Sequence, residues 1–160
     1  MALTLSSPDF SHNGSIPERF TCEGADVSPA LEWSNPPHGT RAYALIVDDP
    51  DAPDPARPQR TWVHWVLYNV PAMVTSLPQA IRDGDLPSGA RVGANDWGQP
   101  KYGGPCPPIG RHRYFFKLYA LDVELADLTP ATKAVLEHAM TGHVLGEASL
   151  IGTYAKRANR

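Results

Sequence analysis

The feature that most constrains the fold is a pair of apolar runs, residues 43–47 and 62–70, separated by a proline-broken acidic segment. The second run has apolar side chains at both odd and even positions, which is typical of a strand covered on both faces. Asp49 and Asp51 lie on either side of a proline, which makes their segment stiff and non-helical. The pattern predicts two buried strands joined by a polar loop, with His64 buried near the start of the second strand.

Proline also sets the fold class, because it makes up 17 of the 160 residues, about twice its usual share of ~5%. Long helices do not tolerate so many prolines, so short strands and loops should dominate. Alternating or apolar runs predict strands at residues 3–5, 31–34, 41–48 and 112–122. Residues 145–154 could extend a preceding helix or form a last strand, and the β-branched and glycine residues at 151–153 favour the strand. The expectation is a mainly β chain with a few short peripheral helices.

One helix is predicted after residue 128. Thr129 has the chemistry of an N-cap, Pro130 suits the first helical position, and Gly142 is a stop signal. No repeat, linker or low-complexity tract interrupts the chain, so residues 1–160 are expected to form a single domain with a full core.

Charge and hydropathy exclude several classes of partner. The net charge of -3 provides no electrostatic field for nucleic acid or for an anionic membrane surface. No run approaches the ~20 apolar residues of a membrane span, so integral membrane association is not expected. The N-terminus lacks the basic start and apolar core of a signal peptide, which predicts a cytoplasmic protein.

Cys22 and Cys106 are the only cysteines, and their number and spacing do not suit a zinc site. In a reducing cytoplasm two free thiols are the expected state, and a disulfide between them is the alternative. Cys106, which lies between prolines, is also considered as a reactive thiol, but no neighbour in the sequence would lower its pKa.

A polar pocket is predicted where the two strongest strands begin. His64 and His112 each start such a strand next to a proline-rich loop, and Asp49, Asp51 and Tyr114 are near them in the pattern. A buried imidazole needs a hydrogen-bond partner, and the carboxylates ending the preceding strand are the natural candidates for His64. The alternative is a purely structural role, in which both histidines are core or edge residues with local hydrogen-bond partners.

Three chemistries suit this set. Two histidines and one or two carboxylates could bind a metal for hydrolysis, but no characteristic ligand spacing supports this. An Asp–His couple could orient a general base, yet no nucleophile motif accompanies it. An anion site leaves the fewest groups unexplained: imidazoles, the Tyr114 hydroxyl and glycine N–H groups would bind a phosphate oxygen. The glycines considered are Gly103, Gly104 and Gly110.

Several motifs, in order, resemble those of the phosphatidylethanolamine-binding proteins: D-P-D-A-P at 49–53, W-V-H at 62–64 and P-P-I-G-R-H-R-Y at 107–114. The segments 20–33 and 95–108 and the I-G-T-Y at 151–154 resemble the bacterial Raf-kinase-inhibitor-like branch. The resemblance covers nearly the whole chain.

The resemblance implies an antiparallel β-sandwich without catalytic activity, cofactor or metal, with a small pocket for phosphate-type anions such as phospholipid headgroups. It places Asp49, His64, His112 and Tyr114 in that pocket. As an alternative, it implies a protein partner, a kinase or a serine protease, that the chain would inhibit through protein–protein contacts. It also implies a possible homodimer. The pocket wall expected from the resemblance comprises Trp62, Pro108, Cys106 and Gly110.

Overall fold

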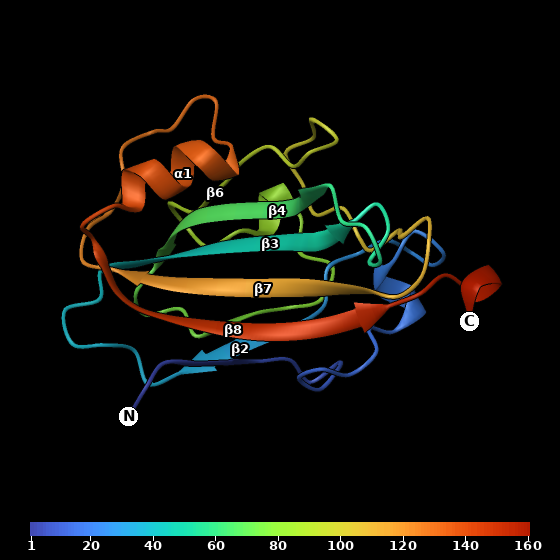
Figure 1. Ribbon diagram of the computed structural model, residues 1–160. Coiled ribbons are helices and arrows are strands. Elements are labelled where there is room, and N and C mark those ends of the chain that lie inside the picture. Colours follow the sequence, from blue (N-terminus) through green and yellow to red (C-terminus); the bar gives the residue numbers. More distant parts are fainter.

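The computed structural model describes all residues, 1–160, and consists of two antiparallel sheets with one short helix (Figure 1). The smaller sheet has the strand order β1-β2-β5 and the larger has the order β6-β4-β3-β7-β8. The predicted mainly β sandwich is thereby confirmed. The strands are β1 Thr4–Ser6, β2 Leu31–Ser34, β3 Ala42–Ala52, β4 Arg60–Pro71, β5 Ser76–Leu77, β6 Arg91–Val92, β7 His112–Leu121 and β8 Val144–Tyr154; the helices are α1 Lys133–Met140 and the short 3-10 turns Glu18–Phe20, Asp83–Asp85 and Arg157–Asn159.

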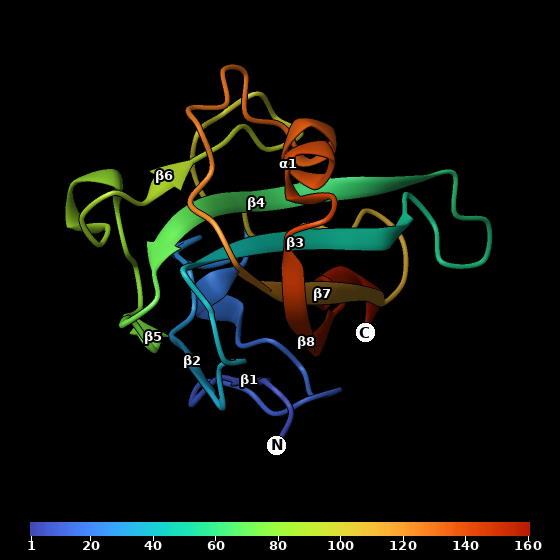
Figure 2. The same cartoon turned by 90° about the vertical axis from the view of Figure 1, so that its left-hand side faces the viewer.

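The main core lies between the two sheets. The alternation predicted for residues 31–34 is observed, because Leu31 and Trp33 of β2 are buried while the residues that follow each of them are exposed. They belong to one cluster with side chains from the large sheet, among them Leu45, Leu67 and Phe116. Figure 2 shows β1 and β2 below the central strands of the large sheet, and the clustered side chains fill the space between these two layers.

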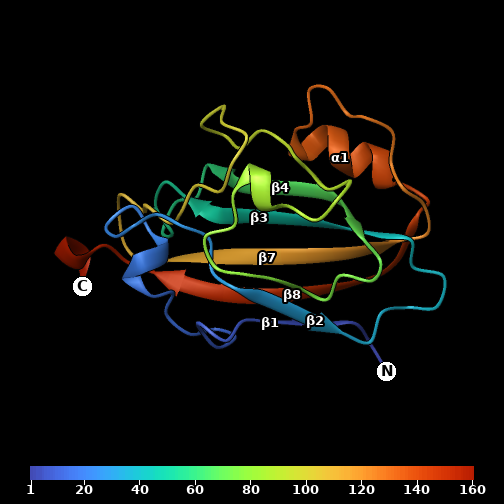
Figure 3. The ribbon, with the colours of Figure 1, turned by 180° about the vertical axis from the view of Figure 1, so that it is seen from behind.

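The opposite face of the large sheet is covered by α1, which lies over β4 and β3 in Figures 1 and 3. Leu136 and Met140 of the helix are buried in a second cluster together with Ile46 and Val66 of the sheet. Because both faces are covered, β3 and β4 are apolar at odd and even positions, as the sequence indicated. The structure contains no helix long and apolar enough to cross a membrane.

The predicted start of the helix is wrong by one turn. The observed N-cap is Thr132, whose side chain accepts a hydrogen bond from the N–H of Val135 (3.2 Å), rather than Thr129. The preceding segment packs against a distant loop, since the carbonyl of Ala131 accepts from the N–H of Ala94 (2.8 Å). Pro130 lies outside the helix, joined to Thr129 by a cis peptide bond. The predicted stop is confirmed, because the helix ends just before Gly142, which has a φ of +82°.

Candidate functional site

Three buried carboxylates at the end of β3 point to different partners. The strand runs to Ala52, further than predicted, and its pairing with β4 shifts register between Val47 and Asp48 and again after Asp49. Asp48 binds two lysine side chains on the α1 side of the sheet, whereas Asp51 binds Arg113 through both carboxylate oxygens (2.9 and 3.0 Å). The hydrogen bond from Arg113 lowers the pKa of Asp51. Only Asp49 remains for the pocket.

Asp49 pairs with His112 of the neighbouring strand β7. The Oδ2 atom of Asp49 lies 2.6 Å from Nδ1 of His112, and both side chains are almost fully buried. Nε2 of the same imidazole lies 2.9 Å from the carbonyl oxygen of Ile109 and 3.1 Å from that of Pro53. Carbonyl oxygens only accept, so Nε2 carries a proton, and both ring nitrogens are occupied by protein groups. Burial raises the pKa of Asp49, although the bond to His112 opposes the shift.

His64 has a different partner from the one expected. Its Nδ1 atom lies 2.7 Å from the carbonyl oxygen of Gly103, and no carboxylate bonds to the ring. The imidazole packs edge-to-face against Tyr114 and Trp97, at centroid distances of 5.2 and 5.1 Å. Desolvation by burial lowers the pKa of His64 to about 4, so the ring is neutral at pH 7. The prediction that a carboxylate at the end of β3 is the partner of His64 is therefore wrong: Asp49 bonds to His112, Asp51 to Arg113, and Asp48 to two lysines.

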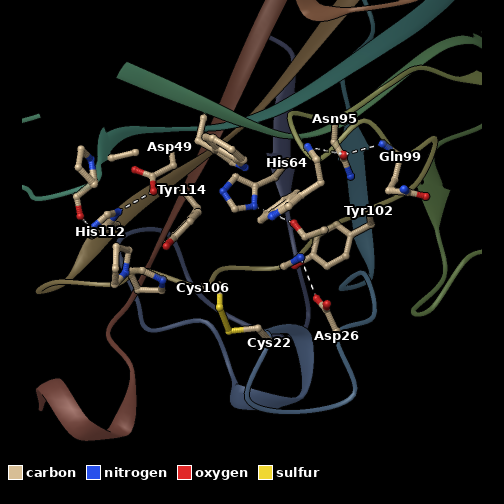
Figure 4. A pocket seen from close by; sticks show the side chains of 18 of the residues that line it. Cys22, Asp26, Asp49, His64, Asn95, Gln99, Tyr102, Cys106, His112 and Tyr114 are labelled. Atoms are coloured by element: carbon tan, nitrogen blue, oxygen red, sulfur yellow. Dashed lines mark hydrogen bonds and ion pairs between the residues drawn. A yellow bond between two sulfur atoms is a disulfide. The ribbon is translucent and has the colours of Figure 1, made fainter. Parts of the chain in front are cut away.

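These residues line a cavity of about 570 Å³ beside the ends of β3, β4 and β7. Figure 4 shows Tyr114 between the Asp49–His112 pair and His64, with the disulfide Cys22–Cys106 along one side. Aromatic rings, proline rings and loop backbone make up most of the remaining wall. The lining also includes Trp62, Asn95, Trp97, Lys101, Tyr102, Asp26 and Pro108.

Two side chains of the lining have buried polar atoms without a hydrogen-bond partner, Nε1 of Trp62 and the hydroxyl of Tyr114. Buried polar groups are almost always bonded, and an unbonded one costs about 1–3 kcal/mol. Burial raises the pKa of the Tyr114 hydroxyl, which therefore keeps its proton. Both residues line the cavity, and neither the indole N–H nor the phenol O–H has an acceptor within the protein.

The glycine- and proline-rich loop 93–108 forms one wall of the cavity, and Asn95 organises it. The Oδ1 atom of Asn95 accepts from the N–H groups of Trp97 and Gln99, and its Nδ2 donates to the carbonyl of Lys101 (2.8 Å). Asn95 was not among the residues that the sequence predicted for the site. No local pattern in the sequence marks it, because its role depends on the folded path of the loop.

The expectation of two free thiols is wrong. Cys22 and Cys106 form a disulfide across 84 residues, and no free cysteine remains. The two loops lie side by side because the N–H of Cys22 donates to the carbonyl of Pro105 (3.1 Å) and the Tyr102 hydroxyl donates to that of Phe20 (2.7 Å). The bond removes Cys106 as a reactive thiol. Disulfides are rare in reducing compartments, so it also argues against the predicted cytoplasmic location, which stays a prediction.

The structure brings together most of the predicted site residues. Asp49, His64, His112 and Tyr114 line one cavity, with Trp62, Cys106 and Pro108 in its wall. Gly110 is not part of the lining; it faces Pro55, whose ring atoms would lie 3.1 Å from an added Cβ. Of the residues of the metal alternative, Asp49 and His112 bond to each other, whereas His64 bonds to a backbone carbonyl and Asp51 to Arg113, and no group of three metal-ligating side chains is close enough to hold an ion.

Comparison with known proteins gives a consistent result. A family model described as phosphatidylethanolamine-binding protein matches residues 6–155. A UPF0098 protein of Methanothermobacter thermautotrophicus is 49% identical over 156 residues, which cover 96% of this chain and 99% of the relative. A crystal structure described as a phosphatidylethanolamine-binding protein homologue from Chlamydia trachomatis has a TM-score of 0.88 and 40% identity, covering 97% of this chain and 98% of the other. The E. coli YbcL structure, described as a member of the mammalian family, has the same TM-score with 33% identity, covering 98% and 100%.

Proposed function

Because this chain belongs to the phosphatidylethanolamine-binding protein family, we propose that it is a non-catalytic binding protein whose cavity takes ligands bearing a phosphate-type anion. The observation that carries the proposal is the pair of buried, unpartnered donors on Trp62 and Tyr114. A phosphate oxygen accepts hydrogen bonds from both kinds of group, and bonds to charged acceptors are the stronger ones. A bound phosphate would supply the acceptors that the protein lacks.

The chemistry of the neighbouring groups favours binding over turnover. The Asp49–His112 couple has no unoccupied imidazole nitrogen to serve as a general base. Both cysteines are in a disulfide, and Tyr114 stays protonated because burial raises its pKa. His64 has a free ring nitrogen, but the lining contains no serine, threonine or free cysteine that it could activate as a nucleophile.

A phosphoethanolamine headgroup fits the charges around the cavity. Asp26 lines it as well, and its Oδ1 accepts from the N–H of Gly104 (2.8 Å). The second oxygen of this carboxylate has no hydrogen-bond partner in the structure, so it is available to an ammonium group. The donors of Trp62 and Tyr114 would then hold the phosphate end of the same zwitterion.

The test is an NMR titration of the isotopically labelled protein with O-phosphoethanolamine, following the His64 ring and the Trp62 indole N–H. Saturable shifts are expected at both groups. Tyr114→Phe should weaken binding about 10- to 150-fold, the equivalent of ~1.5–3 kcal/mol for a hydrogen bond to a charged group. Tyr119→Phe is the matched control, because Tyr119 lies on the opposite face of β7. Absence of shifts at millimolar ligand would refute the proposal.

A further inference from the structure

The hydrogen bond of His64 fixes which of its ring nitrogens carries a proton. Nδ1 lies 2.7 Å from the carbonyl oxygen of Gly103, and this oxygen can only accept, so Nδ1 is the donor. In the neutral imidazole the other nitrogen, Nε2, is then an unprotonated acceptor. Nε2 has no protein partner in the structure, and His64 lines the cavity. The ring therefore offers a lone pair to a ligand.

The surroundings of His64 keep the ring neutral. The side chain is 3% exposed and packs against the rings of Trp97 and Tyr114. Asp48 and Asp96 are the carboxylates whose charge reaches it, and each already has cationic partners. Desolvation outweighs their influence, and the pKa of His64 falls to about 4. The cations that bind these carboxylates are Lys117 and Lys133 at Asp48 and Arg60 at Asp96.

His112 has no free ring nitrogen to offer to a ligand, either as a donor or as an acceptor. Its Nδ1 faces Asp49 and its Nε2 faces two backbone carbonyl oxygens, so a ligand would have to break one of these bonds to reach it. The uncharged side-chain groups with unused hydrogen-bonding capacity around Tyr114 are therefore two donors, on Trp62 and Tyr114, and one acceptor, Nε2 of His64. The charged groups Lys101 and Asp26 also line the cavity.

This combination does not suit a fully ionised phosphate. All terminal oxygens of a phosphate dianion are acceptors, and one of them placed against Nε2 of His64 would oppose two lone pairs. A phosphate monoester that keeps one proton offers an O–H to the imidazole and still has oxygens for Trp62 and Tyr114. The second pKa of such an ester is about 6, so the protonated form is a minor species at pH 7.

We propose, building on the anion-binding function above, that the cavity selects the monoprotonated form of a phosphate monoester because His64 acts as a hydrogen-bond acceptor. Ligand discrimination then depends on a proton that the ligand brings. Sulfate esters, which have the same shape but no such proton near neutral pH, are rejected.

The test is isothermal titration calorimetry with O-phosphoethanolamine and ethanolamine O-sulfate from pH 5 to 8. The affinity for the phosphate ester should be nearly constant below pH 6 and fall about tenfold per pH unit above it, reaching about 100-fold at pH 8. Heats measured in buffers of different ionisation enthalpy should show uptake of about 0.9 proton at pH 7, the fraction of ligand that is dianionic there. The sulfate ester should bind at least about tenfold more weakly at pH 7.

His64→Asn is the diagnostic variant, since its amide N–H can replace Nδ1 at the Gly103 carbonyl but nothing replaces the Nε2 lone pair. It should bind the phosphate and sulfate esters about equally and lose the proton uptake. Nitrogen-15 shifts of His64 in the wild type give a measurement that needs no variant, and they should report the Nδ1–H tautomer from pH 5 to 8.

Equal affinities of the wild type for the two esters, or proton uptake near zero at pH 7, would overturn the selectivity and leave anion binding intact. Failure of O-phosphoethanolamine to bind at any pH would overturn both the selectivity and the proposed function.

Discussion

Removal of the disulfide should lower stability mainly through the unfolded chain. The bond between Cys22 and Cys106 closes a loop over a sequence separation of 84 residues. The loop-closure relation gives about 4.5 kcal/mol at 25 °C for a loop of this size, as an upper value. The folded state should persist in Cys22→Ser/Cys106→Ser, because the two loops also share backbone and Tyr102 hydrogen bonds. A loss of about 4.5 kcal/mol corresponds to a fall in Tm of about 9–18 °C for a domain of this length.

The assay is urea unfolding followed by tryptophan fluorescence, with and without dithiothreitol. The bond involves the exposed Cys22, so reductant should bring the wild type to the stability of the double variant and leave the variant unchanged. The m-value of the variant should also rise, because its unfolded chain exposes more surface. A loss of less than about 1 kcal/mol, with the bond verified in the wild type by mass spectrometry, would refute the entropic reasoning.

Two further predictions concern side chains of the site region. Tyr114→Phe should leave the ligand-free protein as stable as the wild type, or more stable by up to about 1–3 kcal/mol, because the lost hydroxyl is buried without a partner. Urea unfolding measures this, and destabilisation by more than about 1 kcal/mol would mean that the hydroxyl has a partner. Arg113→Met should reduce stability at pH 7, where the ion pair with Asp51 holds the pKa of that carboxyl below its unfolded value of ~3.9. That stabilisation is present above this pH and lost as the pH falls below it. The difference in the free energy of unfolding between wild type and variant should therefore narrow from pH 5 to pH 2. A difference in unfolding free energy that stays constant with pH would contradict the stabilising role of the Arg113–Asp51 ion pair.

The sequence predicted the strands well because their signal is local. The apolar residues of β3 and β4 and the alternation along β7 are readable within ten or twelve positions. The same local reading placed His64 and Tyr114 on strands that end at one pocket. The prediction of the start of α1 was wrong although Thr129 has the chemistry of an N-cap. The segment before the helix bonds to a distant loop at Ala94, which a local pattern does not reveal, and the cap is Thr132.

By itself, then, the sequence determined the strand content, the polar residues at the strand ends and the family to which the chain is similar. Tertiary structure decided which of those polar residues are bonded to one another. The register shifts in β3 and its pairing with β7 place Asp49 beside His112. His64 therefore bonds to the Gly103 carbonyl instead of to a carboxylate. The meeting of Cys22 and Cys106 was likewise set by the packing of two distant loops. Such pairings depend on contacts between segments far apart in the chain, and the properties of the individual residues do not specify them.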